Sequence, residues 1–373
     1  MGEEIMADYR IFTINPGSTS TKIALFEGEK ALFSKTVDHD AAKLKEFSDV
    51  SAQLPYRKET IMNELEAAGI TLDGVDAFVG RGGGLLAVEG GVYTINDVLL
   101  DHAVRGANGV SHPAQLGPQI ANEFAQQYGK PAFVVNPPDT DELIDEARMT
   151  GIKGVYRNVH LHALNLKETA IRHAASQGKK YEEQNYIVCH LGGGLSVSAH
   201  RKGQMIDGND IVGGEGPMAP TRCGAVPAAE LIKICFAEGA DRKELTALCQ
   251  KTGGFVSHLG TSDAREVTKM AREGNKAAER VWNAMLYQIV KFIGSMACAL
   301  HGEVDGILLG GGMVYDESLV DAIKEGCGWI APVYAYPGEF EMEAMAAGAI
   351  RALSGEEKLK VYSGEPRWKG FDD

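Results

Sequence analysis

A short polar stretch near the start of the chain carries residue types that can bind an oxyanion. The stretch Asn15-Pro16-Gly17-Ser18-Thr19-Ser20-Thr21-Lys22 contains one glycine followed by four consecutive hydroxyl side chains. Glycine lets a backbone approach a guest closely, exposed N–H groups can point at it, and hydroxyl groups add donors. Taken alone, the stretch also fits an ordinary polar hairpin turn, so residues elsewhere in the chain must decide.

A second glycine-rich stretch, His190-Leu191-Gly192-Gly193-Gly194, stands in a similar context further along the chain. The two stretches share three landmarks, each 175 residues apart: Asn15 with His190, Gly17 with Gly192, and Gly28 with Gly203. This period is far longer than that of any solenoid repeat, so it predicts a duplicated domain.

Both loops must be positioned by the strands that flank them. Apolar runs predict two opening meanders, at 10–14, 22–26 and 30–37, and at 186–189, 195–200 and from 204 onward. Buried strands are expected at 75–79, 131–135 and 304–309, helices at 56–68, 96–104, 115–128, 161–175, 276–300 and 341–353, and a polar tail after them. Strands that alternate with helices, with glycines at the strand ends, predict an α/β fold.

Composition limits the classes of partner. The 373 residues suit two domains, and 44% hydrophobic and 24% charged residues are ordinary for a globular protein. A net charge of −14 argues against nucleic acid or an anionic membrane as a partner, although a local cationic site can still bind a small anion. No signal peptide is visible in residues 1–9 and no apolar run reaches membrane-spanning length, so a cytoplasmic location is expected. The six cysteines are expected to be buried free thiols rather than disulfides or zinc ligands.

Several segments are specific enough to resemble a known family. Residues 14–22 resemble the opening signature of the acetate kinase family, and residues 190–194 resemble its second signature. Four further segments are similar to butyrate and branched-chain fatty-acid kinases in particular: 81–83, 181–183, 199–203 and 255–267. The resemblance covers about residues 10–351 and places the chain in the superfamily of acetate and sugar kinases, actin and heat-shock chaperones.

The resemblance implies a fold and an activity. The fold would be two duplicated ribonuclease H-like (actin-like ATPase) domains, with mixed sheets flanked by helices and an interdomain cleft. Residues 7–157 with 345–373 would hold the acyl substrate and γ-phosphate, and residues 158–344 the nucleotide. The activity would be reversible phosphorylation of butyrate or a branched acid such as isobutyrate by ATP, giving an acyl phosphate and ADP. Alternatives are an acetate or propionate kinase and a non-catalytic actin-like or chaperone-like ATP switch. A homo-oligomer, at least a dimer, is expected by analogy.

Four residues match the family's catalytic positions: Arg81, Arg222, His162 and Asn15. Arg81 follows a predicted strand among glycines, and Arg222 lies in the Gly/Pro-rich loop 214–224. Both substrates are anions, so guanidinium groups that hold the carboxylate and the transferred phosphoryl suit the reaction. The resemblance gives His162 a hydrogen bond to the phosphoryl group rather than a general-base role, because a carboxylate nucleophile is already ionised.

The resemblance also implies a set of nucleotide contacts. No P-loop motif occurs in the chain, so the phosphates would be held by the two glycine-containing loops and a later glycine run. His190 is alternatively structural, and Asp263 is alternatively a helix N-cap. The expected contacts are Ser18, Ser20, His190, Gly192, Gly193, Gly194, Asp263, Arg265, Gly310, Gly311 and Gly312.

A magnesium ion would accompany the nucleotide and needs few protein ligands. Glu341 aligns best with the family's metal-associated glutamate, with Asn15 assisting, while Glu339 and Glu343 remain alternatives. One departure is visible: relatives usually carry an aspartate where this chain has Asn136, so that charge is either reduced or supplied by Asp139 or Asp141.

Overall fold

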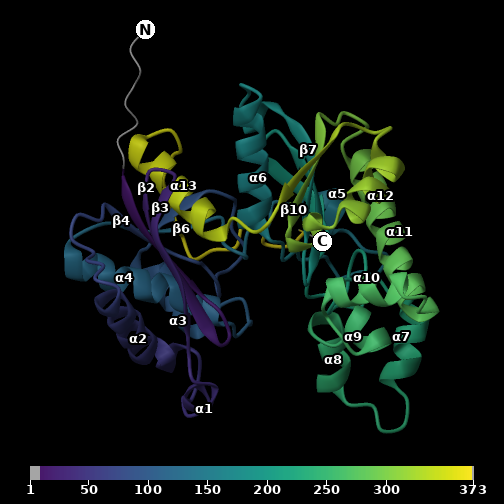
Figure 1. Ribbon diagram of the computed structural model, residues 1–373, viewed down its shortest axis with the longest axis horizontal. Coiled ribbons are helices and arrows are strands. Elements are labelled where there is room, and N and C mark those ends of the chain that lie inside the picture. Colours follow the sequence, from purple (N-terminus) through teal and green to yellow (C-terminus); the bar gives the residue numbers. More distant parts are fainter. Residues whose placement is uncertain (1–8, 372–373) are drawn as a thin grey trace. The chain divides into compact units, whose positions relative to one another are not determined.

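The computed structural model describes residues 9–371, which divide into two compact units (Figure 1). Unit 1 comprises the described residues up to Asp141 and those from Phe340 onward, and unit 2 spans Glu142–Glu339. Both boundaries lie earlier in the chain than the expected 157/158 and 344/345. At the first boundary, Glu142 belongs to unit 2 because its carboxylate pairs with Lys167 Nζ at 2.8 Å. The described residues do not include residues 7, 8, 372 and 373 of the expected N-terminal domain. They also do not include residues 1–8, on which the prediction about a signal peptide rests.

Unit 1 is built on a seven-stranded sheet in the order β12-β5-β6-β4-β1-β2-β3. Its strands are β1 Arg10–Pro16, β2 Ser20–Glu27, β3 Lys30–Asp38, β4 Ala77–Gly80, β5 Val92–Thr94, β6 Ala132–Val135 and β12 Lys360–Val361. Its helices are α1 Ala41–Leu44, α2 Leu54–Ala67, α3 Asp97–Arg105, α4 Leu116–Tyr128 and α13 Glu341–Ser354, with 3-10 turns η1 Ser51–Gln53 and η2 Pro113–Gln115. Side chains alternate along β1, so Phe12 and Ile14 pack with Phe124 of α4 in one core. Helix α13 packs against β1, β2, β4 and β6 and covers the other face (Figure 1).

Unit 2 contains a five-stranded sheet in the order β11-β10-β7-β8-β9. Its strands are β7 Asn185–Leu191, β8 Leu195–Arg201, β9 Gln204–Gly208, β10 Gly306–Gly311 and β11 Val333–Pro337. Its helices are α5 Asp145–Arg148, α6 Ala163–Ser176, α7 Ala228–Cys235, α8 Arg242–Gln250, α9 Gly254–Leu259, α10 Ala264–Arg272, α11 Lys276–Ala299 and α12 Glu317–Cys327, with 3-10 turns η3 Tyr181–Glu183 and η4 Gly312–Tyr315. Tyr186 and Val188 share a core with α6, whereas Ile187 and Cys189 face the core of α11, as alternation along β7 requires.

The two sheets share one topology. The order β3-β2-β1-β4-β6 in unit 1 matches β9-β8-β7-β10-β11 in unit 2, and in each the first two pairings are antiparallel and the last two parallel. The middle strand of each meander also carries a register shift, at Leu25/Phe26 and at Ala199/His200. This confirms the α/β fold and the internal repeat that the glycine spacing predicted.

The segment after residue 353 is more than the polar tail expected from its composition. Lys360–Val361 adds strand β12 beside β5, and Tyr362 is 2% exposed. The Tyr362 hydroxyl accepts a hydrogen bond from the Leu86 N–H at 3.0 Å and lies 2.7 Å from His102 Nδ1. One buried aromatic residue with a satisfied hydroxyl therefore anchors the C-terminal segment to unit 1.

The six cysteines are free, as expected, but their burial differs from the prediction. Cys189 and Cys327 are buried, whereas Cys235 and Cys298 are exposed. Cys235 is the last residue of α7, and no residue of this helix is buried. The apolar residues around Cys235 in the sequence therefore did not indicate that it is buried.

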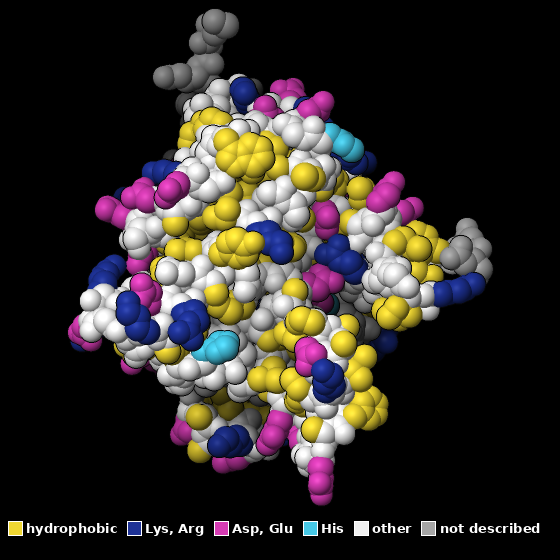
Figure 2. Space-filling view, turned by 90° about the vertical axis from the view of Figure 1, so that its right-hand side faces the viewer, with side chains coloured by type: hydrophobic (Ala, Val, Ile, Leu, Met, Phe, Trp, Pro, Cys, Tyr) yellow, Lys and Arg dark blue, Asp and Glu magenta, His cyan; other side chains and the backbone are white. Residues whose placement is uncertain are grey.

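On the face that Figure 2 shows, hydrophobic side chains and charges of both signs are intermixed. None of the helices within residues 9–371 combines the length and the hydrophobicity that a membrane span requires.

Candidate functional site

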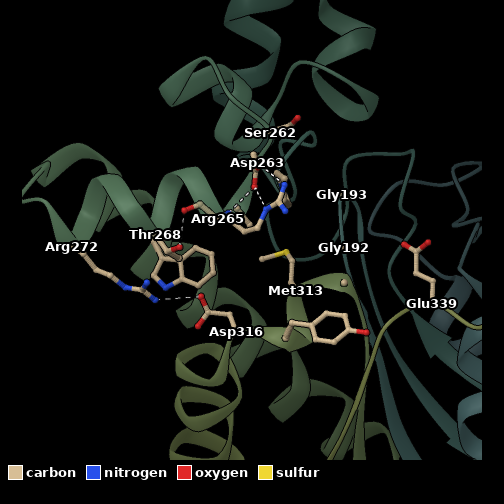
Figure 3. A pocket seen from close by; sticks show the side chains of 15 residues that line it. Gly192, Gly193, Ser262, Asp263, Arg265, Thr268, Arg272, Met313, Asp316 and Glu339 are labelled. Carbon is tan, nitrogen blue, oxygen red and sulfur yellow. Dashed lines mark hydrogen bonds and ion pairs between the residues drawn. The ribbon is translucent and has the colours of Figure 1, made fainter.

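Unit 2 contains a cavity of about 630 Å³ at the turn between β7 and β8 (Figure 3). It brings together five of the predicted nucleotide contacts: Gly192, Gly193, Asp263, Arg265 and Gly312. The remaining wall includes Ser262, Thr268, Arg272, Trp282, Met313, Tyr315, Asp316 and Glu339. Its volume is in the range of small-molecule sites, and its lining mixes aromatic, glycine and charged groups.

Asp263 occupies the N-cap of α10, the alternative that the sequence left open for it. Its carboxylate accepts a hydrogen bond from the Arg265 N–H at 2.9 Å and pairs with Arg265 Nη2 at 2.7 Å. These hydrogen bonds lower the pKa of Asp263 to about 2. Figure 3 shows both side chains at the start of α10 and a second ion pair, Arg272 with Asp316, in the same cavity wall. The two atoms of that pair, Arg272 Nη2 and Asp316 Oδ2, lie 3.8 Å apart. The capping carboxylate therefore also holds Arg265 at the cavity wall.

Gly310 and Gly311 do not line the cavity. Both lie in β10, and Gly311 has φ = 100° with its Cα so close to β7 that a Cβ would stand 2.3 Å from the Leu191 carbonyl oxygen. Strand packing therefore requires glycine at position 311, whereas a Cβ at Gly310 would make only ordinary contacts, the nearest at 3.5 Å. Only Gly312, at the start of η4, reaches the cavity.

Arg222 packs directly against the β7–β8 turn. A Cβ on Gly194 would lie 1.3 Å from Arg222 Nη1, so the guanidinium fills the space that any side chain at position 194 needs. Burial lowers the pKa of Arg222, and the Asp210 carboxylate opposes that shift. Its Nε and Nη1 atoms are buried and make no hydrogen bond within residues 9–371. Buried donors are normally paired, so these unsatisfied N–H groups suit the guanidinium to binding an anion.

We expect Gly194→Ala to lower turnover about a hundredfold by displacing this guanidinium. The end of a flexible arginine can move, so the fold should persist while the position of the fork is lost. Steady-state kinetics measure turnover, and thermal unfolding checks that the variant remains folded. Gly294→Ala in α11 is the control, because a Cβ there meets no atom within 4 Å. Full turnover in Gly194→Ala would show that the fork position does not matter.

His162 and His190 form a stacked pair, with ring centroids 4.1 Å apart. His162 precedes α6, and its Nδ1 lies 2.7 Å from Ser196 Oγ. His190 is buried and lies in β7, and its Nε2 is 3.9 Å from the Glu339 carboxylate. The buried His190 ring therefore supports His162, which agrees with the structural alternative for His190.

In unit 1, Asn15 and Arg81 converge on Glu341. Asn15 Nδ2 donates to Glu341 Oε2 at 2.6 Å, and Arg81 Nε lies 4.0 Å from Glu341 Oε1. Arg81 is 8% exposed, and burial lowers its pKa, while Glu341 and Asp139 oppose that shift. Glu341, the first residue of α13, thus lies beside Asn15 near the end of β1 and Arg81 just after β4.

These contacts bear on the alternatives for the metal ligand and the missing aspartate. Glu339 lies in the unit 2 cavity, whereas Glu341 contacts Asn15. Asn136 has φ = 38°, and its Oδ1 accepts from the Gly91 N–H at 2.8 Å, so its side chain serves the backbone. Asp139 is the second carboxylate whose charge acts on Arg81. Within residues 9–371, no cluster of three acidic, histidine or cysteine side chains could hold a metal by itself.

The β1–β2 loop is held by two residues that sequence reasoning missed, Arg57 and His39. Arg57 Nη1 donates to the Gly17 carbonyl at 2.9 Å, and His39 Nε2 lies 2.8 Å from Thr21 Oγ1. A signal for Arg57 was present in the sequence: on α2 it precedes buried Ile61 and Leu65 at four-residue intervals, which places it on the apolar face. The hydroxyls of Ser18, Thr19 and Ser20 form no hydrogen bond within the described residues.

His39 makes the stability of unit 1 depend on pH. Burial, aided by the Arg57 charge and opposed by Asp38, lowers its pKa from 6.5 to about 4. The unfolded chain therefore binds the proton more readily, so stability is full above pH 6.5 and falls as the pH drops toward 4, by about 3 kcal/mol. Chemical unfolding at several pH values between 4 and 7 measures the free energy of unfolding. This free energy should depend less steeply on pH in His39→Gln than in the unsubstituted protein. An equal pH dependence in the two proteins would contradict this assignment.

Comparisons with known proteins agree with this architecture. Residues 155–324 match the model of the acetokinase family. The chain is 44% identical over 354 residues to a probable butyrate kinase of Clostridium botulinum (strain Eklund 17B / Type B), covering 95% of this chain and 99% of that protein. Among solved structures, it superposes with TM-score 0.75 on Porphyromonas gingivalis acetate kinase (19% identity, 92% of this chain and 100% of that chain). It superposes with TM-score 0.68 on a propionate kinase from Francisella tularensis (18% identity, 91% and 98%). The shared topology, together with 44% sequence identity over nearly the full length of the chain, shows that the chain belongs to the acetokinase family.

Proposed function

We propose that this protein transfers a phosphoryl group from ATP to a short-chain carboxylate, butyrate or a branched acid such as isobutyrate, reversibly giving an acyl phosphate and ADP. The near-full-length likeness to the probable butyrate kinases carries the proposal. The two glycine-containing loops, the buried Arg81, the partly buried Arg222 and the cavity support it with groups suited to two anionic substrates.

The chemistry asks little of the protein beyond positioning and charge. A carboxylate oxygen attacks the γ-phosphorus, the bond from that phosphorus to the β–γ bridging oxygen breaks, and ADP leaves with the electron pair, so no proton transfer is needed. Arg81 would hold the carboxylate or an equatorial phosphoryl oxygen. Arg222 would offer its unpaired Nε and Nη1 to the phosphoryl group, and His162 would donate a hydrogen bond to it.

The cavity in unit 2 would hold the nucleotide. The backbone of Gly192 and Gly193 would approach the phosphates, while Asp263 and Arg265 would lie toward the adenosine. Ser18 and Ser20 of the β1–β2 loop would face the γ-phosphate. Gly194 and His190 would serve by positioning Arg222 and His162.

Magnesium fits the residues around Glu341. One carboxylate and the Asn15 side-chain oxygen are hard ligands of the kind that this ion prefers, and phosphate oxygens and water normally complete its shell. When bound, the ion would neutralise charge on the β- and γ-phosphates. Glu341 and Asn15 would orient it through their mutual hydrogen bond.

We expect Glu341→Gln to weaken the apparent affinity for Mg²⁺ by 10- to 100-fold, on the order found for lost metal-site support. Glutamine keeps the size of the side chain and can still accept from Asn15, so the loss reports on charge. Titration of Mg²⁺ at fixed ATP measures it. Glu343→Gln is the matched control on the same helix, and a greater effect there than at position 341 would transfer the role to Glu343.

A hydroxylamine-trapped acyl-phosphate assay with ATP and Mg²⁺ tests the function directly. It should be run across straight and branched acids from two to six carbons. Highest kcat/KM with butyrate or isobutyrate supports the proposal, and highest kcat/KM with acetate or propionate supports the alternative kinases. ATP binding without acyl phosphate from any acid supports the nucleotide switch.

Assembly as a homodimer or larger oligomer stays a prediction, measurable by light scattering after gel filtration.

A further inference from the structure

Arg57 is a fully buried cation whose described contacts are all uncharged. Its Nε donates to Gln53 Oε1 at 3.0 Å, its Nη1 to Gly17 O at 2.9 Å, and its Nη2 to Ser18 O at 3.2 Å. Within residues 9–371, no carboxylate forms an ion pair with this guanidinium. Burying a charge without a counter-charge is costly, so such a group is rarely kept for packing alone.

These bonds turn one side of the β1–β2 loop toward the protein interior. The carbonyl oxygens of Gly17, Ser18 and Ser20 accept from Arg57, and that of Thr19 accepts from the His39 N–H at 2.8 Å. Four consecutive carbonyl dipoles are thus directed away from the loop's outer side. Because carbonyl oxygens repel anions, the outer side is left to hydroxyl and N–H groups, and Ser18 and Thr19 are exposed there.

The charge of Arg57 persists under physiological conditions. Burial lowers its pKa to about 10, which still leaves the guanidinium protonated at neutral pH. An anion on the outer side of the loop would supply the counter-charge that the described protein does not.

We propose that Arg57 is a positioning residue for the phosphate loop. It fixes the carbonyls of Gly17, Ser18 and Ser20 from beneath and supplies a positive charge that the bound phosphoryl group neutralises. The inference rests on the proposed function for the identity of that anion. It predicts that Arg57 is needed for phosphate binding and turnover, in addition to any contribution to folding.

The test uses inorganic phosphate titrated onto the full-length protein saturated with ADP and Mg²⁺, so that phosphate probes the γ position. Calorimetry measures binding, and thermal unfolding checks the fold. We expect Arg57→Gln to weaken phosphate binding at least tenfold and to lower kcat at least a hundredfold. Arg57→Lys keeps the charge but not the fork, so phosphate binding should change less than threefold while kcat falls about tenfold.

Arg148→Gln is the matched control, because Arg148 is the other large fully buried arginine and lies in unit 2. It should lose stability but keep phosphate binding and kcat. Phosphate binding by folded Arg57→Gln within twofold of the unsubstituted protein would overturn the inference, as would absence of phosphate binding by the unsubstituted protein. If Arg57→Gln does not fold, an unchanged kcat in Arg57→Lys overturns it. Failure to form acyl phosphate from any acid would instead refute the proposed function, and the phosphate titration would still decide the role of Arg57.

Discussion

Arg222→Ala is expected to lower acyl-phosphate formation by about 10³-fold while ATP binding changes little. The physical reason is that Nε and Nη1 of Arg222 are buried without a hydrogen-bond partner in the described chain, so they can pair with charge that develops on the transferred phosphoryl group. Loss of an interaction that is made mainly in the transition state lowers kcat rather than raising KM. Hydroxylamine trapping measures turnover, and calorimetry with ATP measures binding.

Two further variants sharpen this test. Arg222→Lys keeps a charge but not the planar fork and should recover little of the lost activity. Arg201→Ala removes an exposed arginine from the same unit and should leave turnover unchanged. A value of kcat for Arg222→Ala within tenfold of the unsubstituted protein would remove this arginine from the reaction.

Arg81→Met should have an effect of similar size, expressed in kcat/KM for the acid, which we expect to fall about 10³-fold. Methionine preserves much of the buried volume but removes the cation beside Glu341, so the carboxylate substrate would meet uncompensated negative charge from Glu341 and Asp139. The kinetic constants for butyrate and for ATP should be measured separately, since the loss is expected for the acid.

The control for this variant is Arg105→Met, which removes an exposed arginine paired with Asp101 in the same unit. Exposed ion pairs of this kind contribute little, so both activity and stability should be nearly unchanged. An Arg81→Met protein that keeps its affinity for the acid but loses that for ATP would assign Arg81 to the nucleotide instead. Thermal unfolding of both variants separates a lost contact from a lost fold.

The elements flanking the loops were predictable because their signals are local. Alternating apolar residues, turns and glycine-terminated helices predicted both meanders and the helices that became α2, α3, α4, α6, α11 and α13. Helices α7, α8, α9 and α10 were not predicted. Neither α7 nor α8 has a buried residue, so the apolar residues in their sequences do not mark a face that packs against the core. Burial of Tyr362 likewise depends on a partner far away in sequence, so the C-terminal segment was read as a plain tail.

The loop Asn15–Lys22, its repeat at His190–Gly194 and the arginines at 81 and 222 were identified from sequence because residue type, spacing and family resemblance are written along the chain. Their partners were not. Asn15 meets Glu341 across 326 residues, and Arg57 reaches Gly17 across 40. Such pairings depend on how strands and helices stack, and a local pattern contains no information about which distant side chain fills a given space. Tertiary structure alone placed Arg222 against Gly194, His162 on His190, and a buried cation beneath the loop.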